Sequence, residues 1–176
     1  MILIVDMTSD PLWRYEFVDS IGRLLENYDI KHYAEDLALD RYSHVILSGS
    51  SLNDVDYAKH LSKFSWIRNS RKPILGICAG MQAIGLVFGS KLRKCREIGM
   101  TKITTAGRNP LFSGAFDAYE LHNYSADPPK GFRILARSGK CIQAFGKGSI
   151  YGVLFHPEVR NGEIIKKFCS IPIKRL

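Results

Sequence analysis

The 176-residue chain carries a formal net charge of +8, with 45% hydrophobic and 24% charged residues. These values predict one soluble globular domain over residues 1–176. No apolar run is long enough to cross a bilayer and the first residues lack a signal peptide's basic lead, so we expect a cytoplasmic protein with no membrane partner. The basic stretches 90–96 and 164–176 lack interleaved aromatics and nucleic-acid-binding motifs. We therefore interpret them as a solvated surface, or as a docking face for an acidic protein, and expect no nucleic-acid partner.

The first half of the chain alternates short apolar runs with segments of helical periodicity. Strands are predicted at 2–5, 30–34, 44–50 and 73–77, and helices at 15–28, 56–69 and 79–89. This alternation predicts an open, mainly parallel sheet flanked by helices, in the α/β class. Ligand chemistry in such sheets gathers at the carboxyl ends of the strands. The loops after residues 47 and 77 are therefore the first places to search for a site.

The second half is richer in strands. Strands are predicted at 100–105, 117–122, 132–137, 141–146 and 150–155, and a closing helix at 161–170. Turn residues separate these segments, and we find no internal repeat, low-complexity segment or linker.

The four cysteines are Cys78, Cys95, Cys141 and Cys169. No two of them form a CxxC pair, so the spacing gives little support for a zinc site and we expect no metal. In a cytosolic protein all four should be free thiols. Three of them, Cys95, Cys141 and Cys169, are interpreted as small core residues.

Cys78 lies between two glycines in the pattern Gly76-x-Cys78-x-Gly80, where a predicted strand meets a predicted helix. This spacing is typical of a nucleophile elbow, a turn so sharp that side chains two residues from the nucleophile would collide. The helix N-terminus would stabilise a thiolate there. The alternative is a packed thiol in a tight turn, and this stretch alone does not exclude it.

A thiol nucleophile needs a base and a group that orients the base. Of the five histidines, His156 leaves the end of a predicted strand, as Cys78 does, and Glu158 follows two residues later. Residues i and i+2 of an extended segment point the same way, so Glu158 could hold the imidazole of His156. Three others, His32, His44 and His60, are interpreted as surface or satisfied histidines.

Three segments in this order, "VILSGSS" (45–51), "PILGICAGMQAIG" (73–85) and "YGVLFHPEV" (151–159), resemble the class I (triad) glutamine amidotransferases. The resemblance implies a flavodoxin-like fold and a Cys78–His156–Glu158 triad that hydrolyses glutamine to glutamate and ammonia through a thioester. It implies an oxyanion hole formed by the backbone N–H groups of Ser50 and Ala79.

The same resemblance implies that Gly49 and Gln82 lie at the glutamine-binding site. It implies no metal or redox cofactor in this chain, because ATP and Mg²⁺ would belong to a synthetase partner. Within the family the chain looks most like the glutaminase subunit of a two-subunit GMP synthetase, which implies a nucleotide-activating partner and GMP synthesis from XMP. His122 lies in the segment that faces the partner in such subunits.

The chain departs from the family pattern at several positions. Ser50 and Ser51 stand where the family usually has Gly-Pro, and Tyr124 stands where GMP-type subunits have an aspartate. The glycine-rich segment after the first strand is also missing. Two alternatives therefore stay open: a stand-alone γ-glutamyl hydrolase, or an amidotransferase for another acceptor. A third is a non-enzymatic binding module that uses the basic surface.

Overall fold

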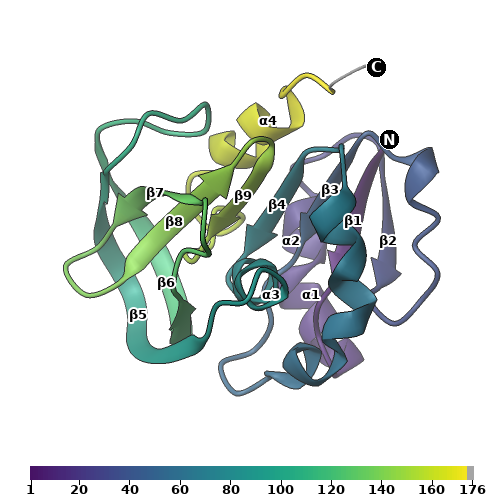
Figure 1. The fold of residues 1–176 in the computed structure, drawn as a ribbon, viewed down its shortest axis with the longest axis horizontal. Helices are drawn as coiled ribbons and strands as arrows, with labels where there is room; N and C mark the ends of the chain where they lie inside the picture. The colour runs from purple at the N-terminus through teal and green to yellow at the C-terminus, as the bar shows by residue number, and fades with distance from the viewer. Residues whose placement is uncertain (174–176) are drawn as a thin grey trace.

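The computed structural model describes residues 1–173 as one mixed sheet with helices on both faces (Figure 1). Residues 174–176, which end the C-terminal basic stretch, lie outside the described residues. The strands, in chain order, are β1 (Ile2–Asp6), β2 (Tyr28–His32), β3 (His44–Leu47), β4 (Ile74–Ile77), β5 (Leu92–Thr105), β6 (Ala115–Ala126), β7 (Arg133–Arg137), β8 (Ile142–Lys147) and β9 (Ile150–Val153). Their order in the sheet is β2-β1-β3-β4-β9-β8-β7-β5-β6.

The predicted α/β class is confirmed. Strands β2, β1, β3, β4 and β9 run parallel, whereas the four ladders from β9 to β6 are antiparallel. The parallel half corresponds to the alternating first half of the sequence plus the last strand. The strand-rich second half supplies the antiparallel extension, so the sheet is mixed over its full width.

Three of the four predicted helices are shorter in the structure, and the fourth, at 56–69, keeps its bounds but is a 3-10 helix. The helical segments are η1 (Pro11–Trp13), α1 (Arg14–Phe17), α2 (Asp19–Gly22), η2 (Leu39–Arg41), η3 (Asp56–Asn69), α3 (Ala79–Val87) and α4 (Glu163–Cys169), where η marks a 3-10 helix. The predicted helix over 15–28 is interrupted at Val18, whose φ of −106° breaks the regular turn. Its last residue already belongs to β2. The predicted helix over 56–69 is 3-10 and kinks at His60.

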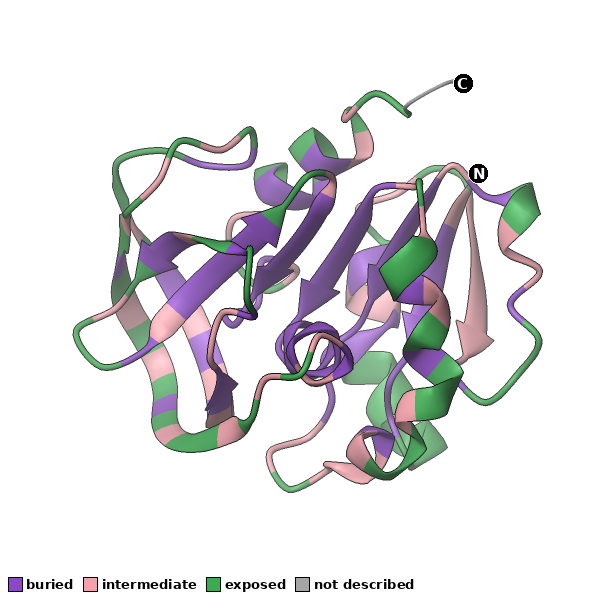
Figure 2. Ribbon diagram, in the orientation of Figure 1, coloured by how far each residue is buried: buried purple, intermediate pink, exposed green. Residues whose placement is uncertain are grey.

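Alternate residues of the parallel strands enter two cores. Leu3, Val45 and Ile74 pack on the face covered by α3 and η3. Their neighbours Ile4, Ile46 and Leu75 pack on the face covered by α1, α2 and α4. Figure 2 shows the central strands and α3 buried. Burial on both faces explains why these strands are apolar runs without alternation in the sequence.

The β5–β6 hairpin is much longer than its predicted strands at 100–105 and 117–122. The two strands stay paired from Leu92 to Thr104, with a β-bulge between Lys94 and Glu97. Burial alternates along both strands, because one face meets the core and the other meets solvent. Charged residues on the solvent-exposed face interrupt the apolar pattern, so a search for apolar runs did not detect the full length of these strands.

The expectation of four free thiols is wrong for one pair. Cys95 and Cys141 form a disulfide with a Cα–Cα distance of 6.4 Å, although 46 residues separate them. Cys95 lies on β5 and Cys141 precedes β8, and the sheet order brings these segments together. Cys78 and Cys169 are free. No helix within residues 1–173 is long and apolar enough to cross a membrane.

Candidate active site

Cys78 occupies a strained turn between β4 and α3. Its φ is +46° and its ψ −100°, a conformation that costs a non-glycine residue about 1–3 kcal/mol. The turn is held because the Cys78 amide donates to the Val153 carbonyl at 2.8 Å and the Gln82 amide donates to the Cys78 carbonyl at 3.0 Å. The strain presents the thiol at the N-terminus of α3. A thiol needed only for packing would not require it.

The two glycines of the elbow pattern are required by close backbone contacts. A Cβ on Gly76 would lie 2.4 Å from the carbonyl carbon of Gly80. A Cβ on Gly80 would lie 2.4 Å from the backbone oxygen of Leu47. Both obstacles are backbone atoms, so a side chain at either position would displace β3, β4 or α3. The sequence-based interpretation of the GxCxG turn is therefore supported by the geometry.

His156 follows β9, the strand that lies beside β4. Ile77 and Val153 are paired at the carboxyl ends of these parallel strands, which places Cys78 and His156 at the same edge of the sheet. The His156 amide donates to the Tyr119 carbonyl of β6 at 2.9 Å. The ring nitrogen Nδ1 of His156 lies 2.7 Å from Oε1 of Glu158. The predicted contact between these two side chains is thus present.

The His156 imidazole is buried, and its charge depends on its neighbours. Burial lowers its pKa, but the Glu158 carboxylate and the neighbouring Cys78 side chain raise it well above the usual value. No standard hydrogen bond joins Nε2 of His156 to the thiol, and Nε2 has no other partner among the described residues. The thiol of Cys78 instead faces the Leu121 carbonyl at 3.7 Å. The influence of Cys78 on the pKa of His156 shows that the two side chains are neighbours.

The two residues whose backbone amides were predicted to form an oxyanion hole, Ser50 and Ala79, line the same cleft as Cys78. Ala79 is the first residue of α3, so its amide has no acceptor within the helix. The Ser50 amide has no acceptor within residues 1–173. The Gly80 amide donates to the Ser48 carbonyl at 3.1 Å, which ties the loop after β3 to the start of α3. Their role in stabilising an oxyanion stays a prediction.

Asp54 holds the Ser50 loop and was not singled out from the sequence. Its Oδ2 accepts the Ser9 amide at 2.7 Å and the Ser50 hydroxyl. Ser50 keeps a negative φ, so the serine that replaces the family's glycine fits here without backbone strain. No sequence signal marked Asp54, because a carboxylate in a loop of small polar residues is common.

The two residues predicted to bind glutamine have structural contacts of their own. A Cβ on Gly49 would lie 2.8 Å from Cε1 of His156, so Gly49 makes room for the imidazole. Gln82 accepts a hydrogen bond from the Tyr57 hydroxyl and donates to the Tyr124 carbonyl at 2.7 Å. Gln82 lines the cleft at Cys78, but both ends of its amide are already bonded. Direct binding of glutamine by either residue stays a prediction.

The placement of His122 differs from the sequence-based assignment. The segment was expected to face a partner, yet the His122 side chain is 1% exposed and points into the β5–β6 hairpin. The reason is strand alternation: His122 shares the inner face of β6 with Glu120. Asn123 and Tyr124 are half-buried and, with Lys94 and Arg96, line an open surface cleft. The assignment of the His122 side chain to a partner surface is therefore wrong for this structure.

The cleft at Cys78 is narrow. It is lined by residues from the loop after β3, the start of α3 and β6, among them Ser50, Leu52, Cys78, Gln82 and Leu121. Its free volume is about 10 Å³, which holds about one water molecule. In this conformation the cleft is therefore too narrow to enclose a glutamine side chain.

Comparison with protein families finds a match to the model described as glutamine amidotransferase class-I over residues 17–170. The chain is 36% identical over 140 residues to a glutamine-hydrolysing GMP synthase subunit of Methanocaldococcus jannaschii, an alignment covering 72% of each chain. It is 33% identical over 147 residues to the protein of the same name from Saccharolobus solfataricus, covering 76% of this chain and 78% of that one.

Solved structures give a consistent picture of the fold. A protein of Thermoplasma acidophilum described as a GMP synthase subunit superposes with a TM-score of 0.82 at 28% identity, covering 95% of this chain and 90% of that one. A glutamine amidotransferase of Thermotoga maritima superposes with a TM-score of 0.74, covering 97% and 81% of the two chains. Its 21% identity supports the fold alone.

Proposed function

The chain belongs to the class I glutamine amidotransferase family, and from this premise we propose that it is the glutamine-hydrolysing subunit of a two-subunit GMP synthase. The observation that carries the proposal is the strained Cys78 turn beside the buried His156–Glu158 pair. The similarity to the glutamine-hydrolysing subunits of GMP synthases supports the choice of product.

In the proposed reaction the Cys78 sulfur attacks the side-chain amide carbon of glutamine. The thiol proton passes to Nε2 of His156, which has no other hydrogen-bond partner among the described residues. Glu158 accepts the Nδ1–H bond, fixing the tautomer that leaves Nε2 free and stabilising the imidazolium that forms. The His156 proton then goes to the departing nitrogen, which leaves as ammonia.

The remaining steps follow from the same groups. The negative oxygen of the tetrahedral intermediate would be bound by the amides of Ser50 and Ala79. A water molecule, deprotonated by His156, hydrolyses the γ-glutamyl thioester to glutamate and restores the thiol. No bond change in this sequence requires a metal or redox cofactor in this chain. ATP and Mg²⁺ are proposed to serve the synthetase partner, which activates XMP.

The narrow cleft supports a subunit that depends on its partner. With about 10 Å³ free at Cys78, the isolated chain should bind glutamine weakly. Contact of the synthetase with the loop after β3, or with β6, would supply the free energy to open the site. We place the pair in the cytoplasm. There we expect the Cys95–Cys141 disulfide to be reduced, since disulfides rarely persist in that compartment.

The test is reconstitution with the ATP-dependent synthetase subunit from the source organism. Glutamate release should be slow for the chain alone and should rise at least tenfold with partner, XMP, ATP and Mg²⁺, accompanied by GMP. Cys78→Ala should abolish glutamine-dependent GMP formation but preserve GMP formation from added ammonium, because ammonium bypasses this chain. Full-rate hydrolysis without any partner would instead support the stand-alone γ-glutamyl hydrolase.

A further inference from the structure

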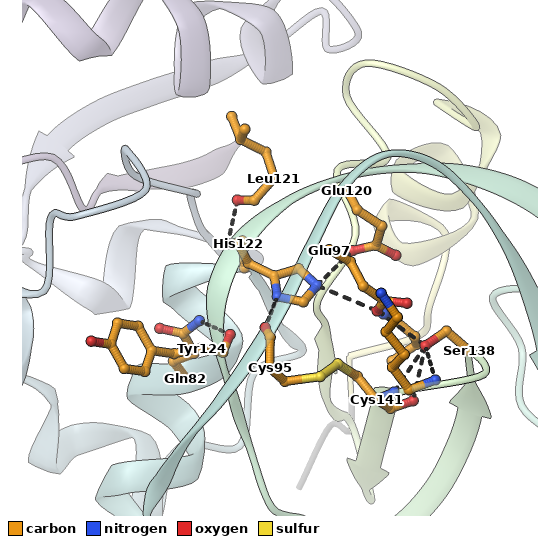
Figure 3. A network of polar contacts seen from close by, with 12 residues as sticks. Gln82, Cys95, Glu97, Glu120, Leu121, His122, Tyr124, Ser138 and Cys141 are labelled. Atoms are coloured by element: carbon orange, nitrogen blue, oxygen red, sulfur yellow. Dashed lines mark hydrogen bonds and ion pairs between the residues drawn. A yellow bond between two sulfur atoms is a disulfide. The ribbon is translucent and has the colours of Figure 1, made fainter.

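A second buried cluster lies on the inner face of the β5–β6 hairpin, separate from Cys78. It consists of Glu97 on β5 and of Glu120 and His122 on β6. Glu97 is paired directly with His122 across the ladder, and Glu120 lies two residues along the same face. The side chains of Glu97, Glu120 and His122 are 6%, 0% and 1% exposed. Figure 3 shows the imidazole directed at both carboxylates.

The hydrogen bonding of this cluster is incomplete. Both carboxylate oxygens of Glu120 and Nε2 of His122 are buried without a hydrogen-bond partner in the described chain. Burying a carboxylate without compensation is costly, so such groups are normally paired or bound to a cation.

The orientation of His122 is that of a metal ligand. Its Nδ1 lies 2.8 Å from the Cys95 carbonyl, so Nδ1–H donates to this carbonyl and Nε2 is the ring nitrogen that faces the two carboxylates. The β-bulge between Lys94 and Glu97 frees that carbonyl from the ladder. Metal-binding histidines typically donate their second ring N–H to a backbone carbonyl in this way.

The distances also fit a bound cation. Nε2 of His122 lies 3.0 Å from Oε2 of Glu120 and 3.7 Å from Oε2 of Glu97. Two donor atoms bound to one tetrahedral zinc ion are separated by about 3.3 Å, given zinc–ligand bonds of about 2.0–2.1 Å. The observed separations lie on either side of that value.

The surroundings of Glu97 also resemble those of a metal-binding carboxylate. Its Oε2 accepts hydrogen bonds from Nε2 of Gln143 at 2.7 Å and from the Ser138 hydroxyl at 3.0 Å. Metal-binding carboxylates are commonly oriented by such donors. The sulfurs of Cys95 and Cys141 also lie near Glu97, but they are bonded to each other and cannot act as thiolate ligands in this state.

We propose that Glu97, Glu120 and His122 form a binding site for one divalent transition-metal ion, with Zn²⁺ as its natural probe. One imidazole and two carboxylates suit zinc or a similar first-row ion better than Mg²⁺ or Ca²⁺, which prefer oxygen ligands alone. A water molecule would complete the four-coordinate geometry that zinc prefers. The ion would cross-link β5 to β6, the strand whose Leu121 carbonyl faces the Cys78 thiol.

The test uses the full chain, stripped with EDTA, dialysed into metal-free buffer and titrated with ZnCl₂. We expect one zinc per chain by elemental analysis and a rise in melting temperature that EDTA reverses. Glu120→Gln should melt no lower than the wild type without zinc, because it removes an unpaired buried carboxylate. Its zinc affinity should fall by more than the roughly 10–100-fold typical of outer-shell changes. Failure of the wild-type chain to take up zinc would overturn the proposal.

Three further variants keep the test decisive. Asp117→Asn, on the exposed face of β6, should bind zinc like the wild type. His122→Asn should lose binding even if Glu120→Gln fails to fold. A Cys95→Ser/Cys141→Ser double variant should retain one zinc, and its Co²⁺ form should lack thiolate-to-metal charge-transfer absorption. Loss of zinc in that double variant would mean that thiolates hold the ion and would overturn the assignment. None of these outcomes depends on glutamine hydrolysis.

Discussion

Nδ1 of His156 lies 2.7 Å from Oε1 of Glu158, and the two side chains are 1% and 0% exposed. This buried pair determines which imidazole nitrogen is available to Cys78 and how readily the ring accepts a proton. Glu158 lies only two residues from His156, so the extended HPE segment itself provides the pairing.

Replacing Glu158 with glutamine should reduce both activity and low-pH stability. The folded-state pKa of His156 is raised, because Glu158 and the Cys78 side chain outweigh the effect of burial. Stability from this pair is therefore fully present below the unfolded histidine pKa of about 6.5 and is lost as the pH rises through the folded value. The free energy of unfolding of the wild type should therefore exceed that of Glu158→Gln by more at pH 6 than at pH 9. Urea denaturation at both pH values measures it.

Glutamine hydrolysis by the same variant, with the partner present, should fall by roughly 10²–10⁴-fold by analogy with other triads. Glu163→Gln, on the exposed surface of α4, is the control and should change neither activity nor the pH dependence of stability. An unfolding difference independent of pH between 6 and 9 would contradict the assigned ionic pair.

A methyl group at Gly49 should impair catalysis more than folding. The added Cβ would lie 2.8 Å from Cε1 of His156 and 3.0 Å from Cδ1 of Phe17. Both obstacles belong to side chains that can shift, so we expect Gly49→Ala to fold with a displaced imidazole. A displacement of about 1 Å can cost about 100-fold in rate. Steady-state kinetics should show a lower kcat, with far-UV circular dichroism unchanged; wild-type kcat in a folded variant would contradict the contact.

A glutamine-like chloroketone should alkylate Cys78 selectively among the cysteines. Burial raises the pKa of the Cys169 thiol to about 11, so very little of it is thiolate at pH 7.5. In protein purified with the Cys95–Cys141 disulfide intact, these two sulfurs are bonded to each other and do not react. Peptide mass mapping should therefore find one modified residue, and glutamine should protect it. Equal labelling in a Cys78→Ala variant would show that another site is being modified.

The sequence contained enough information for the parallel half of the fold and for the elbow. The runs at 44–50, 73–77 and 150–155 predicted strands, and the structure places the corresponding β3, β4 and β9 side by side. The site could be predicted because its key residues are close in the sequence. The glycines lie two residues from Cys78, and Glu158 lies two residues from His156.

Contacts between segments that are far apart in the sequence could not be predicted from local patterns. The Cys95–Cys141 disulfide depends on the order of β5, β7 and β8 in the sheet, which no local pattern encodes. The cluster of Glu97, Glu120 and His122 depends on the register of the β5–β6 ladder. The i, i+2 spacing of Glu120 and His122 was the available signal. It gained meaning only when Glu97 was placed opposite His122.

The strain at Cys78 gives a prediction that separates stability from activity. Its φ of +46° and ψ of −100° suit glycine far better than a residue with a Cβ. Cys78→Gly and Cys78→Ala both remove the sulfur and should both abolish glutamine hydrolysis. The glycine variant should nevertheless be more stable than the alanine variant by about 1 kcal/mol, the lower end of the cost of such backbone strain. Chemical denaturation of both variants measures the difference. An alanine variant as stable as the glycine variant would mean that the turn relaxes once the sulfur is gone, and that the chain does not hold its nucleophile under strain.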